Sequence, residues 1–95
     1  MTYKHIFFTG HAVRRMFERG LTKTDVVVVL GQGEVIAGYP DDTPLPSCLK
    51  LGFVRGMAIH VVVAEDRTAE TCHVVTAYYP DPDLWEPGFR TRRSS

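Results

Sequence analysis

The segment from His11 to Gly20 contains the residues best suited to chemistry. Read as a helix, it places His11, Arg15 and Arg19 at i, i+4 and i+8, so their side chains stack along one side. A titratable imidazole beside two permanent cations suits a site that handles an anion, above all phosphate. The same spacing also describes an ordinary basic helix face exposed to solvent.

Polar side chains further along the chain can complete such a site. His60 lies in an apolar segment that reads as a strand, and Thr76 and Tyr78 lie in the next one. If these strands are neighbours and face His11, the cluster has the parts for RNA transesterification without a metal ion. A base takes the 2′-hydroxyl proton, cations stabilise the phosphorane, and an acid protonates the leaving 5′-oxygen. His60 also fits a half-buried histidine with a purely structural role.

Two helices are expected to position the N-terminal residues. The turn of about 100° per residue gathers an apolar face opposite the basic side, made of Ala12, Val13, Met16 and Phe17. Gly20 suits the left-handed conformation that closes helices. A second helix is expected from about Lys23 to Leu30, with Thr22 as N-cap, Asp25 completing a capping box and Gly31 as terminator.

Four strands are expected to follow the helices, at Glu34–Tyr39, Cys48–Val54, Met57–Ala64 and Thr71–Tyr79. In the last of them, strict alternation places Cys72, Val74, Thr76 and Tyr78 on one face. The tail is expected to pack back onto the body through Leu84, Trp85 and Phe89. The order of elements predicts one α+β domain over residues 1–95, with two N-terminal helices packed on an antiparallel sheet of about four strands.

Composition limits the function further. No apolar run approaches the roughly 20 residues of a membrane-spanning helix, and the N-terminus lacks the features of a signal peptide. We therefore expect a cytoplasmic protein in which Cys48 and Cys72 are reduced and buried. No Cys or His pair has zinc-site spacing, so we expect no metal and no cofactor. The net charge of zero argues against a general nucleic-acid coating protein, although cations gather at both ends.

The order of these residues resembles a known family. The pattern covers nearly the whole chain and consists of His11-Ala12, Arg15-Met16, Arg19-Gly20, His60-Val61, Thr76, Tyr78, Pro80, Trp85, Phe89 and Arg92-Arg93. It is similar to the bacterial domain of unknown function 4258 (DUF4258), whose recurrent polar positions match His11, Arg15, Arg19, His60, Thr76, Tyr78 and Arg92. That family is similar to the RelE-like and barnase-like small ribonucleases. The resemblance implies a toxin of a type II toxin–antitoxin pair.

The leading hypothesis is a metal-independent endoribonuclease of toxin type. In it, His11 or His60 is the base or acid, Arg15 and Arg19 are the cations at the phosphate, and Tyr78 is a proton donor or positioning group. Substrate binding is assigned to Thr76, Trp85 and Arg92, with Trp85 stacking an RNA base. The expected partners are RNA, free or on the ribosome, and a cognate antitoxin protein, with no membrane.

Two alternatives stay open. The chain can be a non-catalytic protein-interaction module in which Arg15 and Arg19 pair with acidic residues of a partner and Trp85 anchors the interface. Alternatively, the charged residues of the first helix only tie it to the rest of the domain. The oligomeric state is not predicted, although Glu34–Tyr39 is a candidate edge strand for pairing with another chain.

Overall fold

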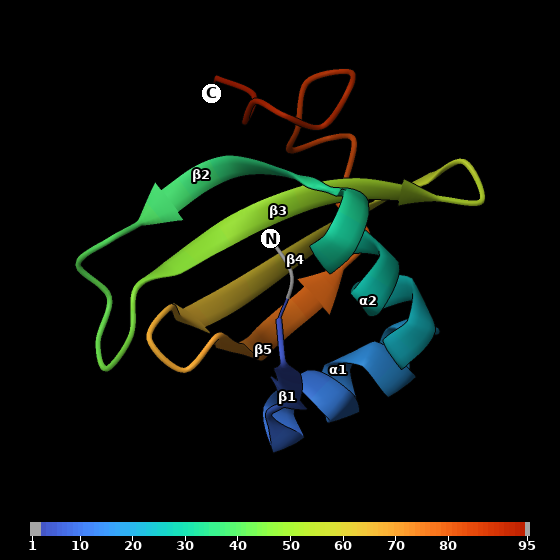
Figure 1. The fold of residues 1–95 in the computed structure, drawn as a ribbon. Coiled ribbons are helices and arrows are strands. Elements are labelled where there is room, and N and C mark those ends of the chain that lie inside the picture. The colour runs from blue at the N-terminus through green and yellow to red at the C-terminus, as the bar shows by residue number, and fades with distance from the viewer. Residues whose placement is uncertain (1–2, 95) are drawn as a thin grey trace.

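The structure is a computed structural model that describes residues 3–94. Within this range the chain forms two helices and five strands (Figure 1), which are β1 (His5–Phe8), α1 (Gly10–Arg19), α2 (Lys23–Gln32), β2 (Glu34–Tyr39), β3 (Ser47–Val54), β4 (Met57–Asp66) and β5 (Thr71–Tyr78). The strands form one sheet in the order β1-β5-β4-β3-β2. β1 runs parallel to β5, and the other neighbours are antiparallel. The predicted α+β class is confirmed.

The prediction of about four antiparallel strands is wrong, because β1 adds a fifth, parallel strand. β1 pairs with the first half of β5, from His5 opposite Thr71 to Phe8 opposite Val74. Its side chains alternate between exposed and half-buried, with Ile6 packed against the core. Four residues give almost no periodicity to read, and their partner lies more than sixty positions away. β1 and β2 are the two sheet edges, so Glu34–Tyr39 is an edge strand as predicted.

α1 is capped at both ends and closes at Gly20 as its sequence predicts, but it buries a narrower face than expected. The Thr9 hydroxyl accepts a hydrogen bond from the Ala12 amide, and Gly20 closes the helix with φ of 73°. Only Ala12 and Met16 are buried, because α1 packs against β5 near one edge of the sheet. The prediction that Val13 and Phe17 also anchor the helix is wrong.

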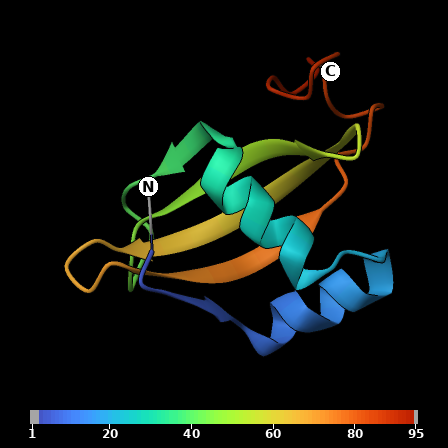
Figure 2. The same cartoon turned by 45° about the vertical axis from the view of Figure 1, so that its right-hand side comes forward.

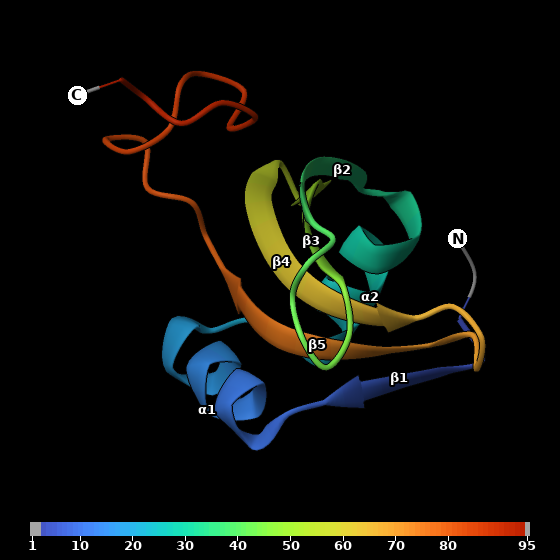
Figure 3. The ribbon, with the colours of Figure 1, turned by 90° about the vertical axis from the view of Figure 1, so that its left-hand side faces the viewer.

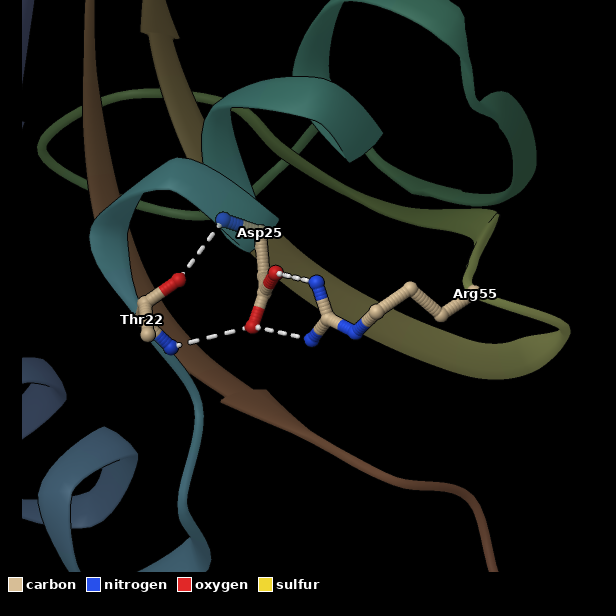
Figure 4. A network of polar contacts seen from close by, with 3 residues as sticks. All are labelled: Thr22, Asp25 and Arg55. Carbon is tan, nitrogen blue, oxygen red and sulfur yellow. Dashed lines mark hydrogen bonds and ion pairs between the residues drawn. The ribbon is translucent and has the colours of Figure 1, made fainter.

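α2 begins with the predicted capping box, in which the Thr22 hydroxyl accepts from the Asp25 amide and the Asp25 carboxylate accepts from the Thr22 amide. Arg55, in the turn between β3 and β4, donates to both oxygens of the same carboxylate (Figure 4). The helix runs to Gln32, so the predicted end at Gly31 is wrong. It stops at Gly33, which has an extended backbone. A side chain at Gly33 would overlap the carbonyl oxygens of Val29 and Leu51.

The main core lies between the helices and one face of the sheet (Figure 2). α2 contributes Val26, Val29 and Leu30, and β4 contributes Ile59, Val61 and Val63. Both Cys48 and Cys72 are buried free thiols in this layer. The opposite face of the sheet carries His60, as the alternation of β4 predicts.

A β-bulge in β5 changes which of its residues face the helices. Val62 pairs with Thr76 while the next residue of β4, Val63, pairs with Val74, so Val75 is an extra residue in β5. Cys72 and Val74 therefore join the core, whereas Thr76 and Tyr78 lie on the other face. The prediction that all four share one face is wrong, because strict alternation does not survive an inserted residue.

The chain after β5 crosses to the side of the sheet away from α2 (Figure 3). There it forms a compact loop closed by a bridge between Trp85 and Arg92. Trp85 and Phe89 are partly buried and anchor this segment as predicted. Leu84 is not an anchor, because 45 % of it remains exposed.

Candidate functional site

A surface hollow of about 500 Å³ forms where the end of α1, the end of β5 and the C-terminal segment meet. Its lining consists of Arg19, Tyr78, Tyr79, Asp81, Leu84, Trp85 and Arg92. Four of these, Arg19, Tyr78, Trp85 and Arg92, were predicted as site residues from the sequence. The fold thus brings together side chains that are separated by more than seventy positions.

His60 is fully buried beneath this hollow and hydrogen-bonds to its wall. Its Nδ1 lies 3.3 Å from the Tyr78 hydroxyl and its Nε2 lies 2.9 Å from the carbonyl oxygen of Phe89. A carbonyl oxygen only accepts, so Nε2 carries the proton. In neutral His60, Nδ1 then accepts the hydrogen bond that Tyr78 donates. Trp85 packs edge-on against the imidazole, with 4.4 Å between ring centroids.

Burial fixes the protonation of this pair. Desolvation lowers the pKa of His60, and the hydrogen bond to the Phe89 carbonyl opposes that shift. Desolvation also raises the pKa of Tyr78. Both groups are therefore neutral at pH 7. The phenol proton points at His60, so the Tyr78 oxygen offers acceptor lone pairs to the hollow.

Two guanidinium groups give the hollow its positive charge. Arg19 donates from Nη1 to the carbonyl oxygen of Ala77 at 2.9 Å, and its guanidinium carbon lies 5.9 Å from the Tyr78 ring centroid. The guanidinium carbon of Arg92 lies 5.8 Å from the Trp85 ring centroid. In residues 3–94 neither arginine forms an ion pair. Since Asp81 is the one carboxylate in the lining, the charge favours an anion.

Arg19 can reach the hollow because the edge of β5 is open beside it. β1 pairs with β5 only as far as Val74, so within residues 3–94 the backbone of β5 beyond that residue has no strand on this side. α1 occupies the position instead, and the Arg19 side chain satisfies the Ala77 carbonyl. The bulge at Val75 then directs Tyr78 toward His60 rather than into the core.

The other predicted site residues lie outside the hollow. His11 is eight residues before Arg19, which corresponds to about 12 Å along the helix axis. Arg15 forms an ion pair with Glu18, with 3.6 Å between Nη1 and Oε2. Thr76 lies on the same sheet face as Tyr78 but further along it, where it pairs with Val62 of β4. The predicted stripe of His11, Arg15 and Arg19 is therefore divided, and only its last member contributes to the lining.

Several groups that line or support the hollow had no functional signal in the sequence. Asp81 lies in a Pro-Asp-Pro-Asp run that reads only as the end of the sheet, and its carboxylate accepts a hydrogen bond from the Asp83 amide. Tyr79 and Leu84 read as sheet and tail residues. The Phe89 carbonyl is a backbone group, and it reaches His60 through a turn in which Phe89 has φ of 62°. Residue types could not have revealed that contact.

A second hollow, of about 470 Å³, lies on the β2 side of the C-terminal segment. It shares Tyr78, Trp85 and Arg92 with the first, so these three side chains form the ridge between two adjoining hollows. Arg90 lines the second hollow and pairs with Glu34 of β2. The surface around Trp85 is thus extended, with room on both sides of the indole.

The protein is a small α+β domain, and the hollow is a surface site lined by aromatic and cationic side chains. The family described as Domain of unknown function (DUF4258) matches residues 8–79, and the chain belongs to this family. The match includes α1, the whole of β2 to β5 and His60, and it ends before Trp85 and Arg92. No curated protein and no solved structure gives a significant match to the chain.

Two further findings concern other kinds of site. Neither helix within residues 3–94 is long and apolar enough to cross a membrane. In the same range, no three His, Cys, Asp or Glu side chains are placed together to hold a metal ion.

Proposed function

We propose that this protein is a metal-independent endoribonuclease, active in the cytoplasm as the toxin of a toxin–antitoxin pair and similar to the RelE-like and barnase-like ribonucleases. The observation that carries the proposal is the contact of Tyr78, which lines the hollow together with Arg19 and Arg92, with the buried His60 beneath it. Proton-transfer groups and two cations around one cavity are the parts that phosphodiester cleavage needs.

The side chains that line the hollow suit a nucleotide chain. The phosphate is placed between Arg19 and Arg92, whose guanidinium groups match phosphate oxygens in geometry and charge. Trp85 offers an aromatic surface on which a base can stack, and the adjoining hollow receives the next nucleotide. Because the overall net charge is zero, this binding depends on the local cations of the hollow.

The reaction follows from the hydrogen bonds already present. The Tyr78 oxygen accepts the ribose 2′-hydroxyl proton as its own proton passes to Nδ1 of His60, and the Phe89 carbonyl stabilises the resulting imidazolium through Nε2. The 2′-oxygen attacks phosphorus and the bond to the 5′-oxygen breaks. That oxygen takes a proton from water, and His60 returns its proton to solvent. The products carry a 2′,3′-cyclic phosphate and a 5′-hydroxyl.

The geometry revises the roles expected from the sequence. Tyr78 is the catalytic residue that touches substrate, and His60 is a positioning residue and proton acceptor that works through it. Arg19 and Arg92 replace the pair of Arg15 and Arg19 at the phosphate. His11 lies outside the hollow and has no part in this reaction.

The test is cleavage of a labelled single-stranded RNA by the purified protein in the presence of EDTA, with the ends identified by mass spectrometry. We expect cyclic phosphate ends from the parent. Arg92→Ala and Tyr78→Phe should each lower the rate about a hundredfold, because each removes a group that acts in the transition state. Arg14→Ala is the matched control, since it removes an arginine from α1 outside the hollow.

Uncut RNA with the parent protein would overturn the proposal. Equal cutting by the parent and Tyr78→Phe would overturn the assignment of Tyr78. The same variants also test toxicity: tightly induced expression of the parent should arrest growth of a bacterial host, and Tyr78→Phe should not.

A further inference from the structure

α1 carries an exposed apolar strip on the side away from the hollow. Phe17 is 86 % exposed and Val13 is 42 % exposed, and at i and i+4 their side chains adjoin. Arg14, three residues before Phe17, lies beside them. Arg19 is two residues beyond Phe17 and therefore about 200° around the helix, toward Tyr78. We call Val13, Arg14 and Phe17 the α1 outer strip.

Nothing in the domain requires a phenylalanine at this place. α1 is held by Ala12 and Met16, which are both buried, and by its two caps. Phe17 is the most exposed of the large apolar residues in the described chain. An aromatic side chain left in water beside an aliphatic one is a recognised feature of protein-binding surfaces.

The charge around the strip favours an acidic partner. Arg14 forms no ion pair with any residue of the described chain. The first turn of α1 contains no acidic side chain, so the positive end of the helix dipole is not offset there. Glu18, the one acid in α1, is paired with Arg15. Exposed apolar surface and positive charge therefore lie together on this side of the helix.

We infer that the α1 outer strip binds a segment of another protein that carries acidic residues next to an apolar side chain. The apolar side chain packs on Phe17 and Val13, and the acidic residues meet Arg14 and the first turn of α1. Val13 favours protein over nucleic acid, because an aliphatic side chain offers no surface for base stacking. This surface is separate from the hollow and does not depend on the proposed ribonuclease activity.

The test uses a displayed library of random twelve-residue peptides, selected on the immobilised full chain. We expect enrichment of peptides that combine acidic and apolar residues, with binding that weakens as salt is raised. Phe17→Ser should weaken a selected peptide roughly thirtyfold, as expected for a central aromatic anchor. Arg14→Glu should weaken it about tenfold or more.

Two controls fix the location. Phe53→Ser removes another exposed phenylalanine, from β3, and Arg92→Ala alters the hollow, so both should bind the peptide like the parent. Phe17→Ser should melt at the parental temperature, because the side chain it replaces is already in water. A loss of binding then reports the surface and not the fold.

Each other outcome would overturn the inference. One is a selection that enriches no peptide, and another is the enrichment of peptides that are neutral or basic. A third is a set of selected peptides that bind Phe17→Ser as well as they bind the parent. Self-association in sedimentation that Phe17→Ser abolishes would identify a second copy as the occupant. An oligouridine whose binding is lost in Phe17→Ser but kept in Arg92→Ala would identify a nucleic-acid surface.

Discussion

Replacing Asp25 by Asn tests the polar network that fixes the start of α2 to the turn between β3 and β4. The Asp25 side chain is 3 % exposed, and its carboxylate accepts from Nη1 of Arg55 at 3.0 Å, from Nη2 at 3.2 Å and from the Thr22 amide at 3.2 Å. An Asn side chain has nearly the same shape. It offers one acceptor oxygen in place of two and carries no charge, so it loses most of these bonds.

The expected loss is about 2 kcal/mol of unfolding free energy. Hydrogen bonds to charged groups are worth about 1.5–3 kcal/mol, and the low end applies because the Arg55 side chain is 70 % exposed and screened by solvent. For a domain of this size, that loss lowers the melting temperature by roughly 8–16 °C. Asp83→Asn is the control, since the Asp83 carboxylate is exposed and forms no ion pair in the described chain.

The same network sets a pH dependence. The Arg55 hydrogen bond holds the pKa of Asp25 below its ordinary value, although burial acts in the opposite direction. A lowered pKa in the folded state means that the carboxylate stabilises the fold above the unfolded pKa of about 3.9, and that this contribution is lost as pH falls through the folded pKa. In urea unfolding, the gap between parent and Asp25→Asn should stay constant from pH 7 to about 5 and narrow below about 4.

Two results would refute this reasoning. A gap below about 0.5 kcal/mol at pH 7 is within the range of ordinary surface substitutions and would show that the network contributes little. A gap that stays the same to pH 3 would show that the Asp25 charge does not contribute.

The remaining predictions concern packing and the thiols. Gly33→Ala should destabilise the fold by about 2 kcal/mol or more, because the new Cβ would lie 2.5 Å from the Val29 carbonyl oxygen. Gly38→Ala, which meets nothing within 4 Å, should leave the urea midpoint nearly unchanged, and equal midpoints for the two would contradict the assignment. Burial raises the pKa of Cys72 to about 11 and also raises that of Cys48. Cys72 should therefore react with a disulfide reagent at pH 8 roughly a hundredfold more slowly than free cysteine, and Cys48 should also react more slowly. In denaturant both thiols should react at the free rate. Fast labelling of the native protein would contradict their burial.

Local signals in the sequence were sufficient for the end of α1, the start of α2 and most strands. The capping box of Thr22 and Asp25 and the closing Gly20 depend on neighbours within a few residues, so residue type predicts them. The strands from Glu34 to Tyr78 are long enough for turns and alternation to mark them. Arg19, Tyr78, Trp85 and Arg92, which were selected on chemistry and on the order of motifs, all line one hollow, although their functional roles stay predictions.

Tertiary contacts decided the rest. β1 exists because the first half of β5 provides a partner distant in sequence. α1 lies against one edge of the sheet, and this position leaves Phe17 in solvent. Its spacing in the sequence had placed it on the apolar face of the helix. Both outcomes depend on which surfaces meet, and no local pattern records that.

The site itself shows the division most clearly. Residue types alone identified His60 and Tyr78 as candidates, yet alternation placed Tyr78 on the same face as Cys72. One extra residue, Val75, reverses the face of every position after it, because side chains in a strand alternate with a period of two. The carbonyl of Phe89 then fixes the protonated nitrogen of His60 through a turn of the C-terminal segment. Sequence supplied the chemical groups, and the bulge and the path of that segment decided which of them meet.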